Sequence, residues 1–138
     1  MTSTLVDTNI LIDILGPARP QRVWSLAALK QCLQDGELVI NPLVWAELAA
    51  SPLSELELTI TFGWLRMRRE ALSYEAAFQA GKAHMRYRRA GGSRDRTLPD
   101  FLVGAHAETR GHRLLTRDAA RYRTYFPSLD ILSPETHP

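Results

Sequence analysis

Short apolar runs with strand character alternate along this sequence with longer stretches whose apolar residues recur at helical spacing. The first run covers residues 2–6, and later ones cover residues 37–40, 113–116 and 130–132. The stretch that follows the first run, residues 8–15, already has helical periodicity. Strands that alternate with helices pair through crossover connections. The pattern therefore predicts an α/β fold with a mostly parallel central sheet of four to five strands, flanked by helices.

Capping residues mark where several helices begin and end. Asn41 can cap a helix that begins at Pro42 and covers residues 42–50. Ser73 can cap a long helix over residues 74–90. Pro99 opens a further helix, which we expect to stop at Gly111 because glycine is the usual left-handed terminator.

Two more segments lie between these helices and the strands. Residues 23–35 have the periodicity of an amphipathic helix. Residues 54–67 are ambiguous, because Leu56, Leu58 and Ile60 alternate as in a strand while the flanking residues suit a helix. We predict a helix there.

The length and cysteine content indicate a single domain over residues 1–138 in a reducing compartment. A chain of this size buries roughly two-thirds of its unfolded surface, so it needs no disulfide or structural metal. Cys32 is the only cysteine and lies in an apolar stretch, where a buried free thiol is expected. No apolar run approaches the roughly 18 residues of a membrane span, and the first residues lack the features of a secretory signal. We expect a cytoplasmic protein without membrane contact.

Positive charge is concentrated in the second half of the chain. Residues 1–65 carry seven acids and three bases, whereas residues 66–138 carry eight acids and fourteen bases. Fifteen of the seventeen bases are arginine, which favours bidentate contacts with phosphate. The densest group lies in residues 82–96, where six bases accompany Asp95 alone among acids. This segment fits either a solvated helix face or a contact surface for a polyanion.

Four acidic residues occupy positions where a parallel sheet gathers functional groups. Asp7 follows the first strand, Glu47 lies in the helix after the second, Asp100 lies in the first turn after Pro99, and Asp118 follows the third strand. Taken singly, each acid could also be a structural residue, because the helix dipole stabilises an acidic side chain near a helix N-terminus. Carboxylates gathered at one sheet edge repel one another, which favours a hard divalent cation between them. Oxygen ligands favour Mg²⁺, for which Mn²⁺ can substitute.

Other chemistries find less support in the sequence. His84, His106, His112 and His137 are dispersed, and we interpret them as surface or core residues rather than zinc ligands. No serine has a nucleophile-elbow context, and Cys32 has no nearby base. No glycine-rich phosphate loop is present.

Four segments together resemble a known family. VDTNILIDIL (6–15), NPLVWAELA (41–49), LPDFLVGAHA (98–107) and LLTRDAARYRTYFP (114–127) resemble the acidic motifs of PIN-domain ribonucleases. They are similar in particular to VapC toxins of bacterial type II toxin–antitoxin pairs, and the resemblance covers the whole chain. It implies Mg²⁺-dependent hydrolysis of cellular RNA, such as tRNA or ribosomal RNA, to a 5′-phosphate and a 3′-hydroxyl. It also implies a cognate antitoxin as partner.

The resemblance assigns roles to individual residues. The catalytic, metal-binding acids it implies are Asp7, Glu47, Asp100 and Asp118, with Thr8, Asn9 and Thr116 as polar supports. Some PIN domains carry a further acid shortly after the fourth, but this chain has Ala119, Ala120 and Arg121 there, which leaves the number of ions, one or two, open. Candidate contacts to the RNA backbone are Arg86, Arg88, Arg89, Arg94, Arg96 and Arg117.

Three alternative functions remain open at this stage. A PIN fold also serves RNA-processing nucleases without a toxin role, or RNA-binding scaffolds without catalysis. A receiver-type signalling module also gathers acids at strand ends, but it needs a lysine that ends a late strand. Lys30 and Lys82 both fall within expected helices, which counts against a receiver.

Large apolar residues in two segments exceed what one small core readily hides. We expect them to form a groove for an antitoxin segment and a homodimer interface. They are Trp24, Leu26, Leu29, Leu53, Leu56, Leu58, Phe62 and Trp64.

Overall fold

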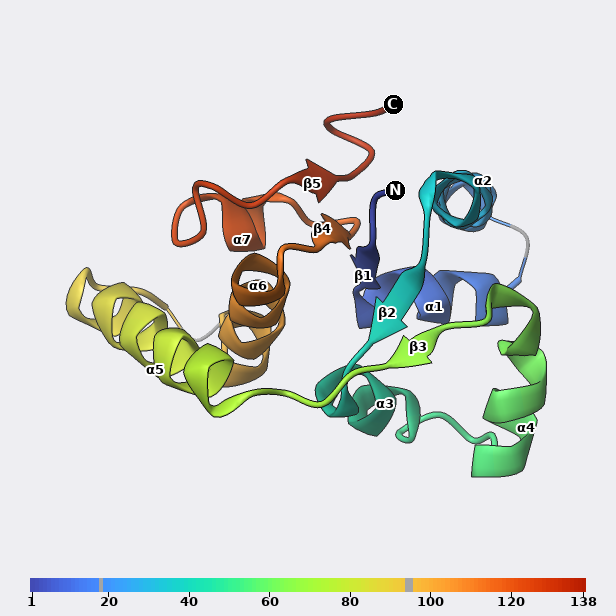
Figure 1. The fold of residues 1–138 in the computed structure, drawn as a ribbon, viewed down its shortest axis with the longest axis horizontal. Coiled ribbons are helices and arrows are strands. Elements are labelled where there is room, and N and C mark those ends of the chain that lie inside the picture. Colours follow the sequence, from blue (N-terminus) through green and yellow to red (C-terminus); the bar gives the residue numbers. More distant parts are fainter. Residues whose placement is uncertain (18, 94–95) are drawn as a thin grey trace.

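One parallel five-stranded sheet forms the centre of the molecule (Figure 1). The computed structural model describes residues 1–17, 19–93 and 96–138. The strand order in this part of the chain is β3-β2-β1-β4-β5, and every pairing is parallel. The strands are β1 (Thr4–Val6), β2 (Leu38–Ile40), β3 (Arg68–Arg69), β4 (Arg113–Leu115) and β5 (Ile131–Leu132). The predicted α/β class with a parallel sheet of up to five strands is confirmed.

The central strands are buried on both faces. Leu5 of β1 is paired with Val39 of β2 on one side and with Leu114 of β4 on the other, and all three side chains are fully buried. Strands covered on both faces are apolar almost throughout, which explains why these segments were recognisable from the sequence. Cys32 is a buried free thiol, as expected.

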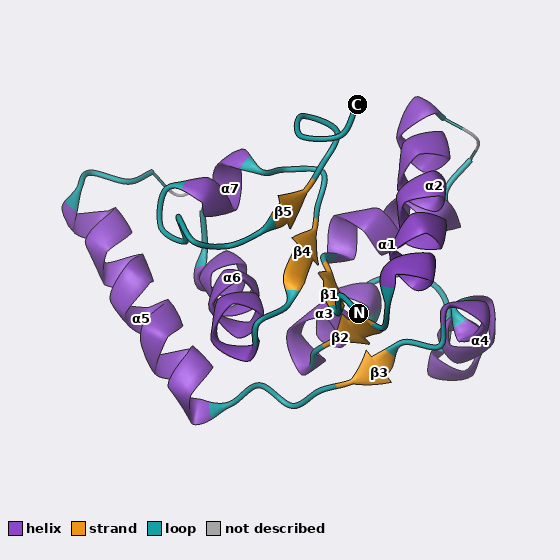
Figure 2. Ribbon diagram, turned by 45° about the horizontal axis from the view of Figure 1, so that its top comes forward, coloured by secondary structure: helices purple, strands orange, loops and turns teal. Residues whose placement is uncertain are grey.

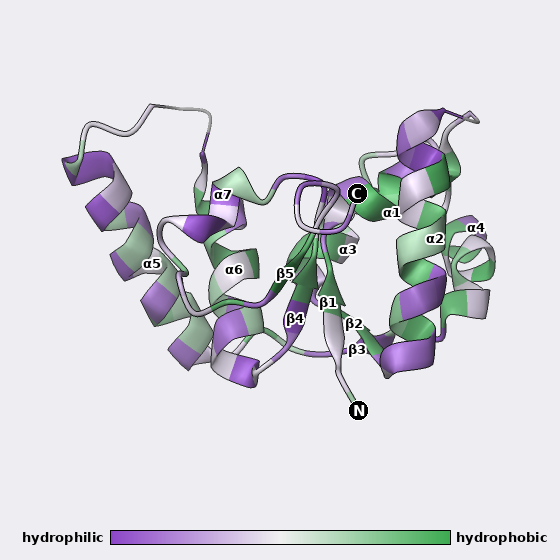
Figure 3. Ribbon diagram, turned by 90° about the horizontal axis from the view of Figure 1, so that it is seen from above, coloured by the Kyte–Doolittle hydropathy of each residue, from purple (hydrophilic) through white to green (hydrophobic). Residues whose placement is uncertain are grey.

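Helices cover the sheet on both sides (Figures 2 and 3). One side carries α1, α2 and α4, and the other carries α5, α6 and α7. The bounds are α1 (Thr8–Leu15), α2 (Pro20–Asp35), α3 (Pro42–Leu48), α4 (Glu55–Thr61), α5 (Tyr74–Arg89), α6 (Leu98–Arg110) and α7 (Ala120–Arg123). None of the helices in the described ranges is both long and apolar enough to cross a membrane.

The predicted caps are confirmed. The Asn41 side chain accepts a hydrogen bond from the Val44 amide at the start of α3, and the Ser73 side chain accepts one from Ala76 at the start of α5. Gly111 ends α6 with φ of 71°, in the left-handed region that glycine adopts without strain.

The ambiguous segment 54–67 is helical over Glu55–Thr61, where Ser54 and Glu57 form a capping box, so this prediction is confirmed. A short 3₁₀ helix, Gly63–Leu65, and the edge strand β3 follow it. The sequence did not reveal β3, because its two residues are exposed arginines without an apolar pattern. It did not reveal α7 either, since four residues are too few to establish a period.

The order of the strands creates a switch point between β1 and β4. From β1 the chain proceeds outward to β2 and β3, and the α5–α6 pair then returns it to β4 on the other side of β1. In open parallel sheets, functional groups gather at the carboxyl ends of the strands beside such a point. Asp7 directly follows β1, and Asp118 lies shortly after β4.

Candidate acidic metal site

Asp7 is the buried centre of the site. It is 7% exposed and caps α1 through the Thr8 amide, which donates to Asp7 Oδ1 at 2.8 Å. Oδ2 accepts from the Tyr122 hydroxyl at 2.8 Å, from Thr116 Oγ1 at 2.9 Å and from Asn9 Nδ2 at 3.4 Å. Each of these donors is neutral.

The environment of Asp7 leaves its negative charge undercompensated. Burial raises the pKa of its carboxyl, the hydrogen bonds from Tyr122, Thr116 and Thr8 oppose that rise, and the charge of Glu47 adds to it. A cation beside Asp7 would favour the ionised form. The donor set of carboxylate and hydroxyl oxygens therefore fits a hard divalent ion.

Thr8 connects Asp7 to Glu47. Its amide binds Asp7, and its hydroxyl donates to Glu47 Oε1 at 2.9 Å. Glu47 lies on α3 and is exposed, so a carboxylate from a neighbouring helix is brought to the rim of the site. Thr8 thus serves both in the start of α1 and in support of the acids.

Thr116 connects Asp7 to Asp118. Its buried hydroxyl donates to Asp7 and accepts from the Asp118 amide at 3.1 Å. Asn9 supports the same turn, because its Oδ1 accepts from the Arg117 amide at 3.2 Å. The loop after β4 is thereby attached to the loop after β1.

Asp100 joins the group through Arg121. Asp100 Oδ2 accepts from the Thr97 amide at 3.1 Å in the capping box of α6. Its Oδ1 lies 3.3 Å from Arg121 Nη1, and Arg121 Nε lies 2.7 Å from Asp118 Oδ2. The structure therefore brings all four predicted acids into one network, which we call the acidic site.

Sequence reasoning missed the roles of Tyr122 and Arg121. Tyr122 is 1% exposed, and the pKa of its hydroxyl is raised well above the ordinary value by burial and by the charge of Asp7. Its position four residues after Asp118 places it one helical turn away, but nothing in the spacing shows a contact with Asp7, 115 residues earlier.

The candidate RNA-binding arginines fall into different environments. Arg86, Arg88 and Arg89 are exposed in the last turn of α5. Figure 3 shows this end of α5 at the same end of the molecule as the carboxyl end of β1. Arg96 stands 5.8 Å from the centre of the Tyr87 ring, and Arg117 pairs with Asp13 at 2.6 Å. Arg94 lies outside the described residues.

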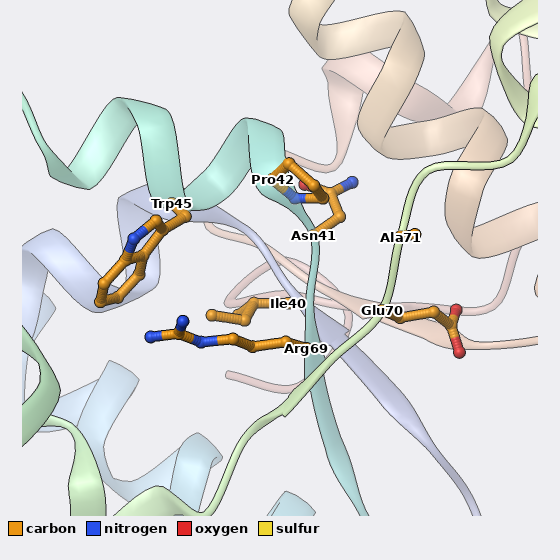
Figure 4. Close-up of a pocket in the computed structure, with 7 residues that line it drawn as sticks. All are labelled: Ile40, Asn41, Pro42, Trp45, Arg69, Glu70 and Ala71. Carbon is orange, nitrogen blue, oxygen red and sulfur yellow. The ribbon is translucent and has the colours of Figure 1, made fainter.

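A second polar cluster joins Glu70, which follows β3, to α6 and to the residue before β4. In Figure 4 the Arg69 side chain extends toward Trp45, and its guanidinium lies 4.5 Å from the ring centre, whereas Glu70 points the opposite way. Glu70 Oε1 accepts from His106 Nε2 at 2.7 Å and from His112 Nε2 at 2.8 Å. We call this cluster, with Arg68 on Oε2 at 2.6 Å, the Glu70 network.

The Glu70 network is complete as a set of hydrogen bonds. Asn41 Nδ2 donates to His106 Nδ1 at 3.3 Å, and the Ser3 hydroxyl contacts His112 Nδ1 at 2.6 Å. Because the Glu70 carboxylate only accepts hydrogen bonds, both rings carry a proton on Nε2, toward Glu70. The three side chains are close enough to share a metal ion. An ion would have to replace both protons beside the Arg68 guanidinium, so we interpret the network as structural. We expected surface or core residues at these positions, and both histidines are buried, where they share the Glu70 carboxylate as a hydrogen-bond partner.

This fold and site define a protein class. The sequence model of the PIN domain matches residues 4–127, and the chain belongs to that family. No curated protein is similar enough in sequence to count as a match.

Solved structures share the fold at low sequence identity. The chain is similar to VapBC2 of Rickettsia felis bound to a promoter DNA fragment, at 19% identity and a TM-score of 0.73, with 96% of this chain and 98% of that one covered. VapBC-1 of nontypeable Haemophilus influenzae gives 19% identity, a TM-score of 0.72 and the same coverage. A toxin–antitoxin complex of Klebsiella pneumoniae gives 22% and 0.64, with 95% and 97% covered.

Proposed function

We propose that this chain is a metal-dependent endoribonuclease that acts as the toxin of a VapBC-type pair in the cytoplasm. The supporting observation is the convergence of Asp7, Glu47, Asp100 and Asp118 at the switch point of a PIN fold. Mg²⁺, or Mn²⁺ in its place, is the ion that this oxygen set suits. The proposed substrate is cellular RNA, with tRNA and ribosomal RNA as the first to test.

The chemistry requires neutralisation of an anionic phosphodiester and an activated water. A divalent ion held by these acids would supply both, because such an ion lowers the pKa of a bound water and stabilises a departing oxygen. The residues of the chain hold the acids in place. Tyr122 and Thr116 fix the orientation of Asp7, and Thr8 fixes that of Glu47.

The arginines at the end of α5 suit the backbone of the RNA. Arg86, Arg88 and Arg89 are exposed, and they lie at the same end of the molecule as the acidic site. Their charge would attract phosphates on either side of the scissile bond.

An apolar groove beside Glu47 suits the antitoxin. A cavity of about 460 Å³ lies between the end of α1 and the segment after α3, and Ile12, Leu53 and Glu47 are among its lining residues. Nearby, Leu56 and Ile60 on α4 are 69% and 71% exposed. A Klebsiella pneumoniae toxin–antitoxin complex has the same fold, which supports such a partner.

The groove differs in detail from the predicted residue set. Leu29, Leu58 and Phe62 are buried in the core, and Trp24, Leu26 and Leu53 are partly buried. Leu56 and Trp64 remain exposed, at 69% and 45%. A homodimer, the other proposed assembly, would be served by the exposed Tyr74 and Phe78 of α5.

Asparagine variants of the acids test the proposal. Asp7 is the N-cap of α1, where Asn serves about as well as Asp, and Asn at position 100 keeps an oxygen for the Thr97 amide in the capping box of α6. Asp7→Asn and Asp100→Asn should therefore melt near the wild type without metal. Both should show a smaller rise in melting temperature with Mn²⁺ than the wild type does. Both should also lose Mg²⁺-dependent cleavage of a labelled tRNA pool. Asp130→Asn, at an exposed acid ahead of β5, is the matched control.

Two outcomes would refute the nuclease. One is unchanged cleavage by Asp7→Asn, and the other is a wild type that Mn²⁺ does not stabilise. Covalent labelling by a small phosphodonor would instead support a receiver, although Lys30 and Lys82 lie in α2 and α5 rather than at a strand end. RNA binding without cleavage would support a scaffold.

A further inference from the structure

The acidic site has two halves with different electrostatics. The described donors to Asp7 and Glu47 are all neutral: one backbone amide, one side-chain amide and hydroxyl groups. Asp100 and Asp118 instead share a guanidinium, since Arg121 approaches them at 3.3 Å and 2.7 Å. The negative charge of Asp100 and Asp118 is thus compensated by a residue of the chain, whereas that of Asp7 and Glu47 is not.

Among the described residues, Arg121 is the basic residue that forms ion pairs with both Asp100 and Asp118. It lies in α7, three residues after Asp118, in a short run that contains no further acid. The neighbouring arginines in the sequence pair with other acids: Arg117 pairs with Asp13, and Arg123 pairs with Glu135.

We propose that Arg121 is a built-in second cation of the acidic site. Its guanidinium lies between Asp100 and Asp118 and compensates their charge, so the site would bind a single ion, for which Asp7 and Glu47 supply the uncompensated charge. This inference rests on the proposed function, because it assumes that the acids bind a divalent ion.

Arg121 can also serve the substrate from this position. Its side chain is 43% exposed, and the two acids engage Nε and Nη1 only. A guanidinium has five N–H donors in a planar fork, so others remain to bind a phosphodiester oxygen. Two carboxylates hold the fork in place, and Arg121 thereby positions the scissile phosphate against the single ion.

The test combines ion counting with cleavage. Mn²⁺ bound per chain, measured by electron paramagnetic resonance, should saturate at one for the wild type. Arg121→Gln removes the charge and should bind Mn²⁺ about tenfold more tightly, because a unit charge repels a dication even at high effective dielectric. The same variant should cut RNA more slowly at saturating Mn²⁺. Tighter metal binding with slower cleavage is a combination that a purely structural role for Arg121 would not produce.

Three further variants complete the design. Arg121→Glu should raise the count to two ions, because a third carboxylate then faces Asp100 and Asp118. Arg121→Lys keeps the charge and should keep the Mn²⁺ affinity near that of the wild type. Arg123→Gln, on the same helix but paired with Glu135 at 3.6 Å, should change neither ion binding nor cleavage.

Defined results would overturn the inference. Two ions on the wild type would do so, and so would Arg121→Gln with unchanged or weaker Mn²⁺ affinity. Failure of the proposed function looks different, since Asp7→Asn would then bind Mn²⁺ as the wild type does. Loss of Mn²⁺ binding in Asp7→Asn, with no effect of Arg121→Gln, removes only the role of Arg121.

Discussion

Glu70 offers a quantitative test of the buried polar network under α6. Its Oε1 is the acceptor for two buried histidine N–H groups, at 2.7 Å and 2.8 Å, and His106 and His112 are 0% and 6% exposed. Glu70→Leu preserves much of the volume and removes both oxygens. The two imidazole donors would then face an apolar side chain without an acceptor.

The magnitude follows from the number of groups left without a partner. An unsatisfied buried donor costs roughly 1–3 kcal/mol, and there are two. The pair with Arg68, whose side chain is 43% exposed, adds less than about 1 kcal/mol. We expect Glu70→Leu to lower the free energy of unfolding by about 3–5 kcal/mol, a large part of the total for a domain of this size. Glu70→Gln keeps one acceptor oxygen and should cost about 1–2 kcal/mol.

Urea denaturation at neutral pH, without added metal, measures these differences. Glu37→Gln is the matched control, because Glu37 pairs with the same Arg68 at 2.8 Å but is about half exposed, and we expect a change below about 1 kcal/mol. If Glu70→Leu is too unstable for its unfolding to be measured, the free energies of unfolding of Glu70→Gln and Glu37→Gln can still be compared. A cost below about 1 kcal/mol for Glu70→Leu, or equal costs for Glu70→Gln and Glu37→Gln, would refute the reasoning.

Three further predictions concern pH and RNA. Burial raises the pKa of Glu70, but hydrogen bonds from His112, His106 and Arg68 outweigh it and bring the pKa to about 2, below its ordinary 4.5. Its stabilisation is therefore complete above pH 4.5 and is lost as the pH falls toward 2, and melting curves should show this loss in the wild type but not in Glu70→Gln. Burial also lowers the pKa of His106 from 6.5, so stability should begin to fall as the pH drops below 6.5. Replacing the three exposed α5 arginines with Gln should weaken binding to single-stranded RNA and reduce its salt slope by roughly 0.7 per lost phosphate contact; an unchanged slope would identify a merely solvated helix face. The three arginines replaced in this test are Arg86, Arg88 and Arg89.

The fold was predictable where burial on both faces imposes an apolar pattern. The runs at β1, β2 and β4 could be recognised because every residue there meets a helix layer or another strand. The edge strand β3 escaped because pairing on one side only lets its arginines face solvent. The local sequence has no pattern that predicts such a strand, because its position depends on pairing with β2.

The acids of the site were predictable for a topological reason, but their partners were not. Asp7 directly follows β1 and Asp118 lies in the loop shortly after β4, so their place at one edge follows from parallel pairing. The contact of Tyr122 with Asp7 spans 115 residues, and that of Glu70 with His112 spans 42. Such contacts depend on side-chain directions after α6 and α7 have packed, which periodicity does not report.

The Glu70 network and the acidic site share two structural elements. Helix α6 presents Asp100 at its first turn and His106 farther along, and β4 lies between His112 and the turn that holds Thr116 and Asp118. Glu70 binds both histidines through one oxygen, so it fixes α6 relative to β4. Arg121 bridges Asp100, in the first turn of α6, and Asp118, just after β4. The distance between these two carboxylates is therefore set by the Glu70 network. The half of the site around Asp7 and Glu47 is attached to α1 and α3, and the Glu70 network reaches this half through Asn41, which bonds His106 and caps α3.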